Sequence, residues 1–133
     1  MARYRVFFPA LILAAVCACG IAHAESCVNP GMNTAQKGEC ADRRAAESDV
    51  QMRESYQRAI AAARALLSTG WKVDFQPDIK ETQQRWKRWM KAQCSLEADV
   101  TMGSAGGIIG SMCVERLTRE RAAALDDLTK QLQ

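Results

Sequence analysis

The sequence lacks several features that common functional classes require. Its one histidine, His23, lies near the N-terminus, so we expect neither a histidine-based catalytic centre nor a zinc site. The formal net charge of +3 is too small to indicate a nucleic-acid partner. There is no internal repeat and no low-complexity tail. A chain of 133 residues without these features is typical of one small domain.

The N-terminal segment has the organisation of a secretory signal peptide. Two arginines in the first five residues precede an uncharged apolar run, Val6–Val16. This run has the length of a signal-peptide core and is too short to span a bilayer as a helix. Ala22–Ala24 then supplies small residues for cleavage after Ala24. We therefore expect a signal peptide over residues 1–24, a periplasmic or secreted domain over residues 25–133, and no membrane span after cleavage.

A second export route would attach a lipid anchor to Cys19. Residues 16–20 loosely resemble a lipobox, in which an acylated cysteine becomes the first residue, but the usual leucine three positions earlier is absent. Cleavage after Ala24 instead removes two arginines and no acid, so the net charge falls from +3 to +1. The mature domain then contains no histidine.

Four cysteines would remain in that domain: Cys27, Cys40, Cys94 and Cys113. An even number in a small exported chain indicates disulfides, and four cysteines allow three connectivities. We predict the pairs Cys27–Cys40 and Cys94–Cys113. Zinc binding and thioredoxin-like redox catalysis are not expected, because the cysteines have no CxxC spacing. Each bridge closes a loop of roughly 14 to 20 residues and should stabilise the fold by about 3 kcal/mol.

The mature chain carries the apolar spacing of a helical protein. Residues 41–68 are rich in good helix formers, with apolar side chains at intervals of three and four. Two acid–base pairs at i,i+4 support this helix: Asp49 with Arg53 and Glu54 with Arg58. We expect turns before it, with a short helical stretch at about residues 34–37, and Gly70 after its end.

Two further helices are expected after a connector. Residues 71–75 alternate apolar and charged side chains without a partner strand, so we expect an extended segment that packs Trp71, Val73 and Phe75 against the helices. A second helix should begin at Pro77, with Asp78 and Glu81 at the spacing of a capping box. The last helix is expected from about residue 112 to 132. Its apolar stripe consists of Val114, Leu117, Arg121, Leu125, Leu128 and Leu132.

The second helix has two distinct faces. One face combines Ile79, Gln83, Trp86, Trp89, Met90 and Cys94, and the other combines Lys80, Gln84, Lys87, Arg88 and Lys91. Aromatic and basic residues that alternate in this way also occur on surfaces for nucleic acids or anionic glycans. Helical spacing favours a buried aromatic side and a solvated basic side instead.

Residues 102–111 contain four glycines and are predicted to form a loop between the last two helices. The segment lacks the Gly-Lys-Ser/Thr ending and the preceding strand of a phosphate-binding loop. It is then either a plain linker or a recognition loop, and two isoleucines in it are either a core anchor or an exposed tip. The candidate binding residues are Gly103, Ser104, Gly106, Gly107, Ile108 and Ile109.

No pattern in the sequence indicates an enzyme. Serine, threonine and cysteine side chains have no histidine partner in the mature domain, and no carboxylate lies in an evident catalytic motif. We therefore expect no catalytic residue, no bound metal and no cofactor.

The C-terminal half resembles the LprI-type lysozyme-inhibitor family. The resemblance rests on the set Gln83, Trp86, Trp89, Ala92, Cys94, Gly106, Gly107, Cys113, Leu117, Thr118, Arg121 and Leu125, and extends upstream to Tyr56 and the first two cysteines of the mature domain. It covers nearly all of residues 27–128. The resemblance implies a helical, disulfide-tied exported domain that inhibits a lysozyme-type muramidase, with Thr118 and Arg121 on the third helix facing the second.

One stretch departs from the family pattern. The family usually has an aromatic-Arg-Asp-x-Glu-Cys run before the third cysteine of the domain, whereas this chain has Met90, Lys91 and Gln93 at the charged positions. If those charges form a partner-binding or helix-pairing network in the family, this protein has lost it. The alternative to an inhibitor is therefore a non-inhibitory interaction module that binds another envelope protein.

Overall fold

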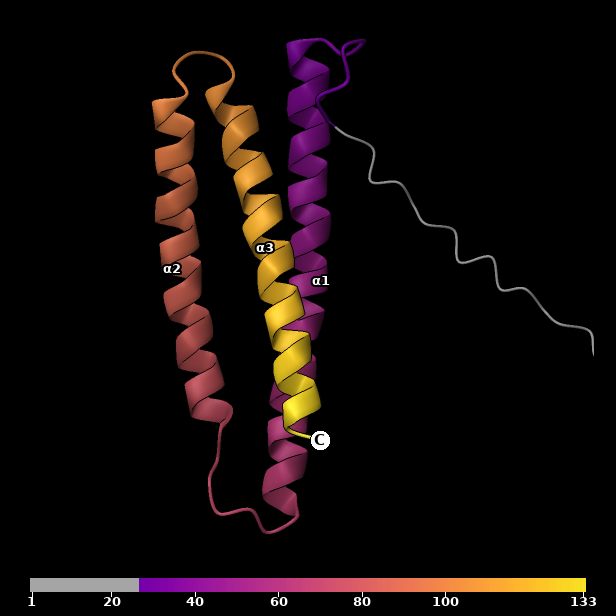
Figure 1. Cartoon of the computed structure of the whole chain (residues 1–133), viewed down its shortest axis with the longest axis vertical. Coiled ribbons are helices and arrows are strands. Elements are labelled where there is room, and N and C mark those ends of the chain that lie inside the picture. The colour runs from indigo at the N-terminus through magenta and orange to yellow at the C-terminus, as the bar shows by residue number, and fades with distance from the viewer. Residues whose placement is uncertain (1–26) are drawn as a thin grey trace, which may run out of the picture.

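Three long helices make up the computed structural model, which describes residues 27–133 (Figure 1). They are α1 (Thr34–Ser68), α2 (Gln76–Val100) and α3 (Gly106–Gln131), and residues 27–133 contain no strand. The all-α prediction is confirmed. None of the described helices is both long enough and apolar enough to cross a membrane. The predicted signal peptide and Cys19 lie outside the described residues.

Helix α1 begins earlier than the sequence predicted. The Asn33 side chain accepts a hydrogen bond from the Gln36 backbone N–H, the Gln36 side chain accepts one from the Asn33 backbone N–H, and both distances are 2.9 Å. This reciprocal cap starts a helix that continues through Gly38. The predicted helical stretch at residues 34–37 is therefore confirmed, whereas the prediction of turns at residues 38–40 was wrong. The end was predicted correctly, because Gly70 follows the helix with a φ of 94°.

Of the two ion pairs predicted along α1, one forms. Arg53 Nε lies 3.0 Å from Asp49 Oδ2. The predicted Glu54–Arg58 pair is wrong, because Arg58 reaches across to α3 and its Nη2 lies 2.8 Å from Asp126 Oδ1. A long arginine side chain near a neighbouring helix can pair with either helix, and here the neighbour provides the acid.

The connector and the start of α2 differ in part from expectation. Residues 71–75 form no strand, as predicted, and Phe75 packs against the core. Trp71 and Val73 are about half exposed, so their predicted packing was wrong. The predicted capping box does not form, because α2 begins at Gln76, two residues before Asp78, without a side-chain cap.

Helix α3 begins six residues before the predicted start, at Gly106. The glycine-containing connection between the last two helices is confirmed, but it covers only residues 101–105. The prediction that residues 106–111 lie in a loop was wrong. Glycine lowers helix stability by about 1 kcal/mol relative to alanine, and packing against α2 and α1 compensates for that cost in this segment.

The core lies along α3. Helix α3 packs extensively against α1 and also against α2, whereas α1 and α2 make few contacts with each other. In Figure 1, α3 accordingly lies between the other two helices. The larger apolar cluster contains Met52, Ala59, Ile60, Ala62, Ala63, Ile79, Leu125 and Leu132, and the smaller contains Cys94, Cys113 and Leu117. Trp86 packs against both clusters.

Both predicted disulfides are present. Cys27–Cys40 ties the segment before α1 to that helix, and Cys94–Cys113 joins α2 to α3. All four cysteines are buried. The second bridge matters more for the architecture, because α2 depends on α3 for most of its packing.

Replacing Cys94 and Cys113 together by alanine should lower the free energy of unfolding by about 3 kcal/mol, because the unfolded chain regains the entropy of an open loop. Urea unfolding of the oxidised proteins, followed by circular dichroism, measures this change. An unchanged unfolding midpoint would contradict it.

Candidate functional site

Several residues of the family motif meet where α3 packs against α2. Arg121 Nε on α3 donates a hydrogen bond to Gln83 Oε1 on α2 at 2.9 Å. Its Nη2 donates to Thr82 Oγ1 at 3.4 Å. The guanidinium carbon also lies 5.9 Å from the centroid of the Trp86 ring. One cation therefore makes three different contacts with α2, and Arg121 faces the second helix as predicted.

This junction extends to α1 through Gln83. The buried Gln83 amide donates from Nε2 to Met52 Sδ at 2.9 Å, so its two ends connect α3 with α1. Thr118 is fully buried one turn before Arg121, and Tyr56 packs against the larger core cluster. These motif residues therefore hold the bundle together and present little surface to a partner.

Burial lowers the pKa of Arg121, because removal from water disfavours the charged form of a cation. An arginine nevertheless keeps its proton at neutral pH. The Gln83 oxygen and the Trp86 ring compensate for part of the lost hydration.

The two motif tryptophans have different environments. Trp86 is half-buried, but Trp89 is 51% exposed, so its predicted burial was wrong. Three residues advance a helix by about 300°, which turns Trp89 away from α3. Trp89 shares the outer face of α2 with two further exposed apolar residues, Leu96 and Val100. We call these three residues the outer stripe. Their spacing of seven and four residues places them on one helix face, but the sequence analysis did not predict an exposed apolar face there.

The connection between α2 and α3, residues 101–105, forms the tip of a helical hairpin. Met102 has a φ of 42° and Gly103 a φ of 86°, so two successive residues adopt the left-handed conformation that turns the chain. Thr101 Oγ1 donates to the Glu97 carbonyl oxygen at 2.8 Å and closes the end of α2. The Met102 side chain is 84% exposed at the tip.

The predicted binding loop is divided between the tip and α3. Helix α3 has Ala105 as its N-cap, and no side chain caps its first turn. Backbone N–H groups of that turn are therefore directed toward the tip. Two of the candidate binding residues, Gly103 and Ser104, are exposed at the tip. The other four lie in the first turn of α3: Gly106, Gly107, Ile108 and Ile109.

The adjacent glycines of the motif have different surroundings. A Cβ atom on Gly106 would lie 2.8 Å from the carbonyl oxygen of Ala98, so this position needs glycine for α3 to approach α2. A Cβ atom on Gly107 would have no heavy atom within 4 Å. Only the first glycine is required by packing.

Two of the three positions that depart from the family pattern make contacts within the protein. Gln93 Nε2 donates to Glu97 Oε1 at 3.0 Å, and Arg116 Nη2 of α3 lies 2.9 Å from the same oxygen. The hydrogen bond from Gln93 lowers the pKa of the Glu97 carboxyl, and the contact with Arg116 adds a smaller effect in the same direction. Met90 packs against the Cys94–Cys113 cluster, and Lys91 is exposed.

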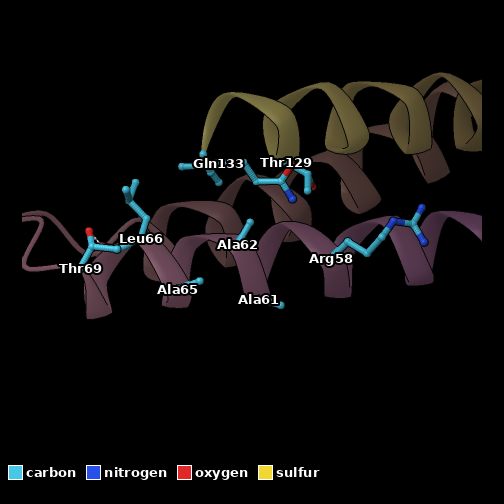
Figure 2. A pocket seen from close by; sticks show the side chains of 9 residues that line it. Arg58, Ala61, Ala62, Ala65, Leu66, Thr69, Thr129 and Gln133 are labelled. Atoms are coloured by element: carbon cyan, nitrogen blue, oxygen red, sulfur yellow. Dashed lines mark hydrogen bonds between the residues drawn. The ribbon is translucent and has the colours of Figure 1, made fainter.

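Two of the hollows on the helical body are relevant to binding. One, the α2–α3 groove, has a volume of about 560 Å³ and is lined by Asp49, Trp86, Lys87, Met90, Lys91, Cys94, Ser95, Ala98, Gly107, Gly110, Ser111 and Val114. The other, of about 510 Å³, lies between the C-terminal ends of α1 and α3 (Figure 2). In the latter, Arg58 is paired with Asp126, and Thr129 Oγ1 donates to the Leu125 carbonyl oxygen at 2.9 Å.

A protein-family model described as Lysozyme inhibitor LprI matches residues 27–125. The matched region includes both disulfides, all of α1 and α2, and most of α3. No curated protein and no solved structure matches the chain. Within residues 27–133, no three His, Cys, Asp or Glu side chains gather where they could hold a metal ion.

The substitutions Gly106→Ala and Gly107→Ala should have opposite effects on stability. The first forces the new methyl group against the Ala98 carbonyl oxygen and should lower the free energy of unfolding. The second adds a methyl group in open space and should raise it by about 0.5 to 1 kcal/mol, because alanine favours the helix. Thermal unfolding of the two variants tests this, and equal melting temperatures would contradict the assignment.

Replacing Arg121 by methionine should lower the free energy of unfolding by about 1 to 3 kcal/mol, because the buried Gln83 oxygen loses its donor. Arg119→Met is the matched control, since Arg119 is exposed and pairs with Glu115 one turn away. Urea unfolding should show little change for the control. If both variants lost the same free energy of unfolding, Arg121 would contribute no more to stability than a surface arginine does.

Proposed function

The chain belongs to the LprI lysozyme-inhibitor family, and from this premise we propose that it is an exported cell-envelope protein that binds and inhibits a lysozyme-type muramidase. The observation that carries the proposal is the hairpin tip with the adjoining outer stripe. Trp89, Leu96 and Val100 present exposed apolar side chains along one face of α2, and Met102 is exposed at the tip that follows it. Exposed apolar groups that cluster in this way are typical of protein-binding surfaces.

Export is supported by two features. The proposed signal peptide over residues 1–24 directs residues 25–133 to the periplasm or the exterior. Both disulfides suit an oxidising compartment, where such bonds form and persist. A muramidase that attacks the cell wall would be met in the same place.

The proposed mechanism is obstruction of the sugar-binding cleft of the enzyme. Muramidases hydrolyse glycosidic bonds with two carboxyl groups that flank the cleft. The hairpin tip has the complementary chemistry, because backbone N–H groups at the start of α3 can donate to carboxylates. Val100 and Met102 would fill apolar parts of the cleft. With a mature charge near +1, long-range attraction contributes little, and the fit depends on shape and local hydrogen bonds.

In this mechanism the protein performs no reaction of its own. The family motif residues position the tip: Arg121 and Gln83 join the helices, and Gly106 allows α3 to approach α2. The alternative is a module that binds another envelope protein without inhibiting an enzyme. The substitutions Met90, Lys91 and Gln93, relative to the family pattern, favour it if those positions contact the muramidase.

Purified residues 25–133 should inhibit lysis of peptidoglycan, followed as the loss of turbidity, in a dose-dependent manner. The double substitution V100S/M102S should raise the inhibitory concentration about tenfold, which corresponds to about 1.4 kcal/mol of lost binding. Val73→Ser is the matched control, because it removes a half-exposed valine from the connector before α2. It should leave inhibition unchanged.

Full activity of several lysozyme classes at a large molar excess of the protein would reject the inhibitor proposal. If the V100S/M102S variant inhibits as well as the unchanged protein, the protein is still an inhibitor, but the hairpin tip is not its contact surface. Recovery of a non-hydrolase envelope protein alone in an affinity pull-down would support the alternative.

A further inference from the structure

The α2–α3 groove has different chemistry at its two ends. The end near Trp86 carries Lys87 and Lys91, which lie one turn apart on α2. Toward the hairpin tip, the groove continues over the Cys94–Cys113 bridge and Met90 to Ala98 and the glycines of α3. The groove is thus cationic at one end and largely apolar along the rest.

The polar groups of the groove are mostly used by the protein itself. Ser111 Oγ donates to Asp42 Oδ1 at 2.5 Å, and Asp49 is paired with Arg53. In contrast, Lys87 and Lys91 are exposed, and neither has an ion-pair partner among residues 27–133. What the groove offers a ligand is therefore mostly apolar surface, two free ammonium groups and the exposed Ser95 hydroxyl. A sugar would need more unpaired hydrogen-bonding groups.

The two lysines suit one compact anion. Residues four apart on a helix have Cβ atoms about 5 to 6 Å apart, so both ammonium groups can reach the same carboxylate. An acidic helix in the groove would be matched by cations spread along its length, whereas Lys87 and Lys91 lie together at one end.

The dimensions suit a single alkyl chain. The groove has a volume of about 560 Å³, which lies within the usual range of about 300 to 1,000 Å³ for small-molecule sites. The α2 residues that line it, Trp86 to Ala98, span about 18 Å at about 1.5 Å per residue. One extended alkyl chain can lie along the floor of a groove of this length.

We propose that the α2–α3 groove binds a free long-chain carboxylate, with the headgroup between Lys87 and Lys91 and the alkyl chain directed toward Gly107. This is a second binding activity, and it does not require that the protein inhibit a muramidase. Its headgroup end lies on α2 away from the hairpin tip, and its apolar end reaches the first turn of α3 at Gly107. The carboxylate is attracted to the cationic end of the groove and the alkyl chain contacts its apolar part, so the ligand can bind in only one orientation.

The binding can be followed through Trp86, which lines the groove. The sequence contains three tryptophans, so the W71F/W89F variant of residues 25–133 leaves Trp86 as the only indole emitter. Titration with myristate below its micelle concentration should change this emission saturably with one site per chain. Dodecyl maltoside, which has no charge, should bind at least about tenfold more weakly.

Two further substitutions test the headgroup and the chain separately. In the same background, K87A/K91A should weaken myristate binding about tenfold, whereas K72A/K80A, which removes equal charge outside the groove, should not. Gly107→Leu should block the apolar end without unfolding the protein, because a Cβ atom there meets no other atom within 4 Å. Circular dichroism verifies that each variant keeps its helices.

Several results would overturn the proposal. They are equal binding of myristate and dodecyl maltoside, unchanged affinity in K87A/K91A, and unchanged affinity in a folded Gly107→Leu variant. Binding of a designed acidic amphipathic peptide in place of myristate would assign the groove to a helix. Co-sedimentation with phosphatidylglycerol vesicles without binding of free myristate would assign it to a membrane surface.

Discussion

The attachment of α2 to α3 is the constraint on which the rest of this structure depends. Helix α2 makes few contacts with α1, so its position depends mainly on α3. A covalent bond, Cys94–Cys113, a buried cation, Arg121, and a close backbone approach at Gly106 maintain that attachment. Because α2 packs mainly on one neighbour, it keeps an exposed outer face, and a groove remains along its contact with α3. Both proposed binding surfaces result from this asymmetry.

The family motif and the accessible surface are formed largely by different residues. Gln83, Trp86 and Arg121 are occupied with one another and with α1. The residues that a partner could touch, such as Leu96 and Met102, are outside that set. Membership of the family therefore accounts for the shape of the body and the projection of the tip. The choice of partner depends on the exposed residues that the body presents.

Local patterns predicted helices well but predicted contacts between helices poorly. The acid-first spacing within α1 was satisfied for Asp49 and Arg53, but Arg58 paired with Asp126 on α3. Spacing along one chain shows which side chains can meet within a helix. It contains no information about an acid on a neighbouring helix at a similar distance. The start of α3 was missed for the same reason, because four glycines oppose a helix locally and packing of the segment against α2 supports it.

The sequence by itself determined the helical class, the buried stripe of α3 and the family, because these depend on periodicity, composition and residue types. The structure decided which of the three possible cysteine pairings forms. The tertiary structure alone decided that Trp86 is half-buried while Trp89 is exposed, and that Gly106 is confined while Gly107 lies in open space. Each of these pairs lies on one helix and differs only in direction from its axis. Which direction is buried depends on where the neighbouring helix lies, and that position is set by the packing of the whole bundle.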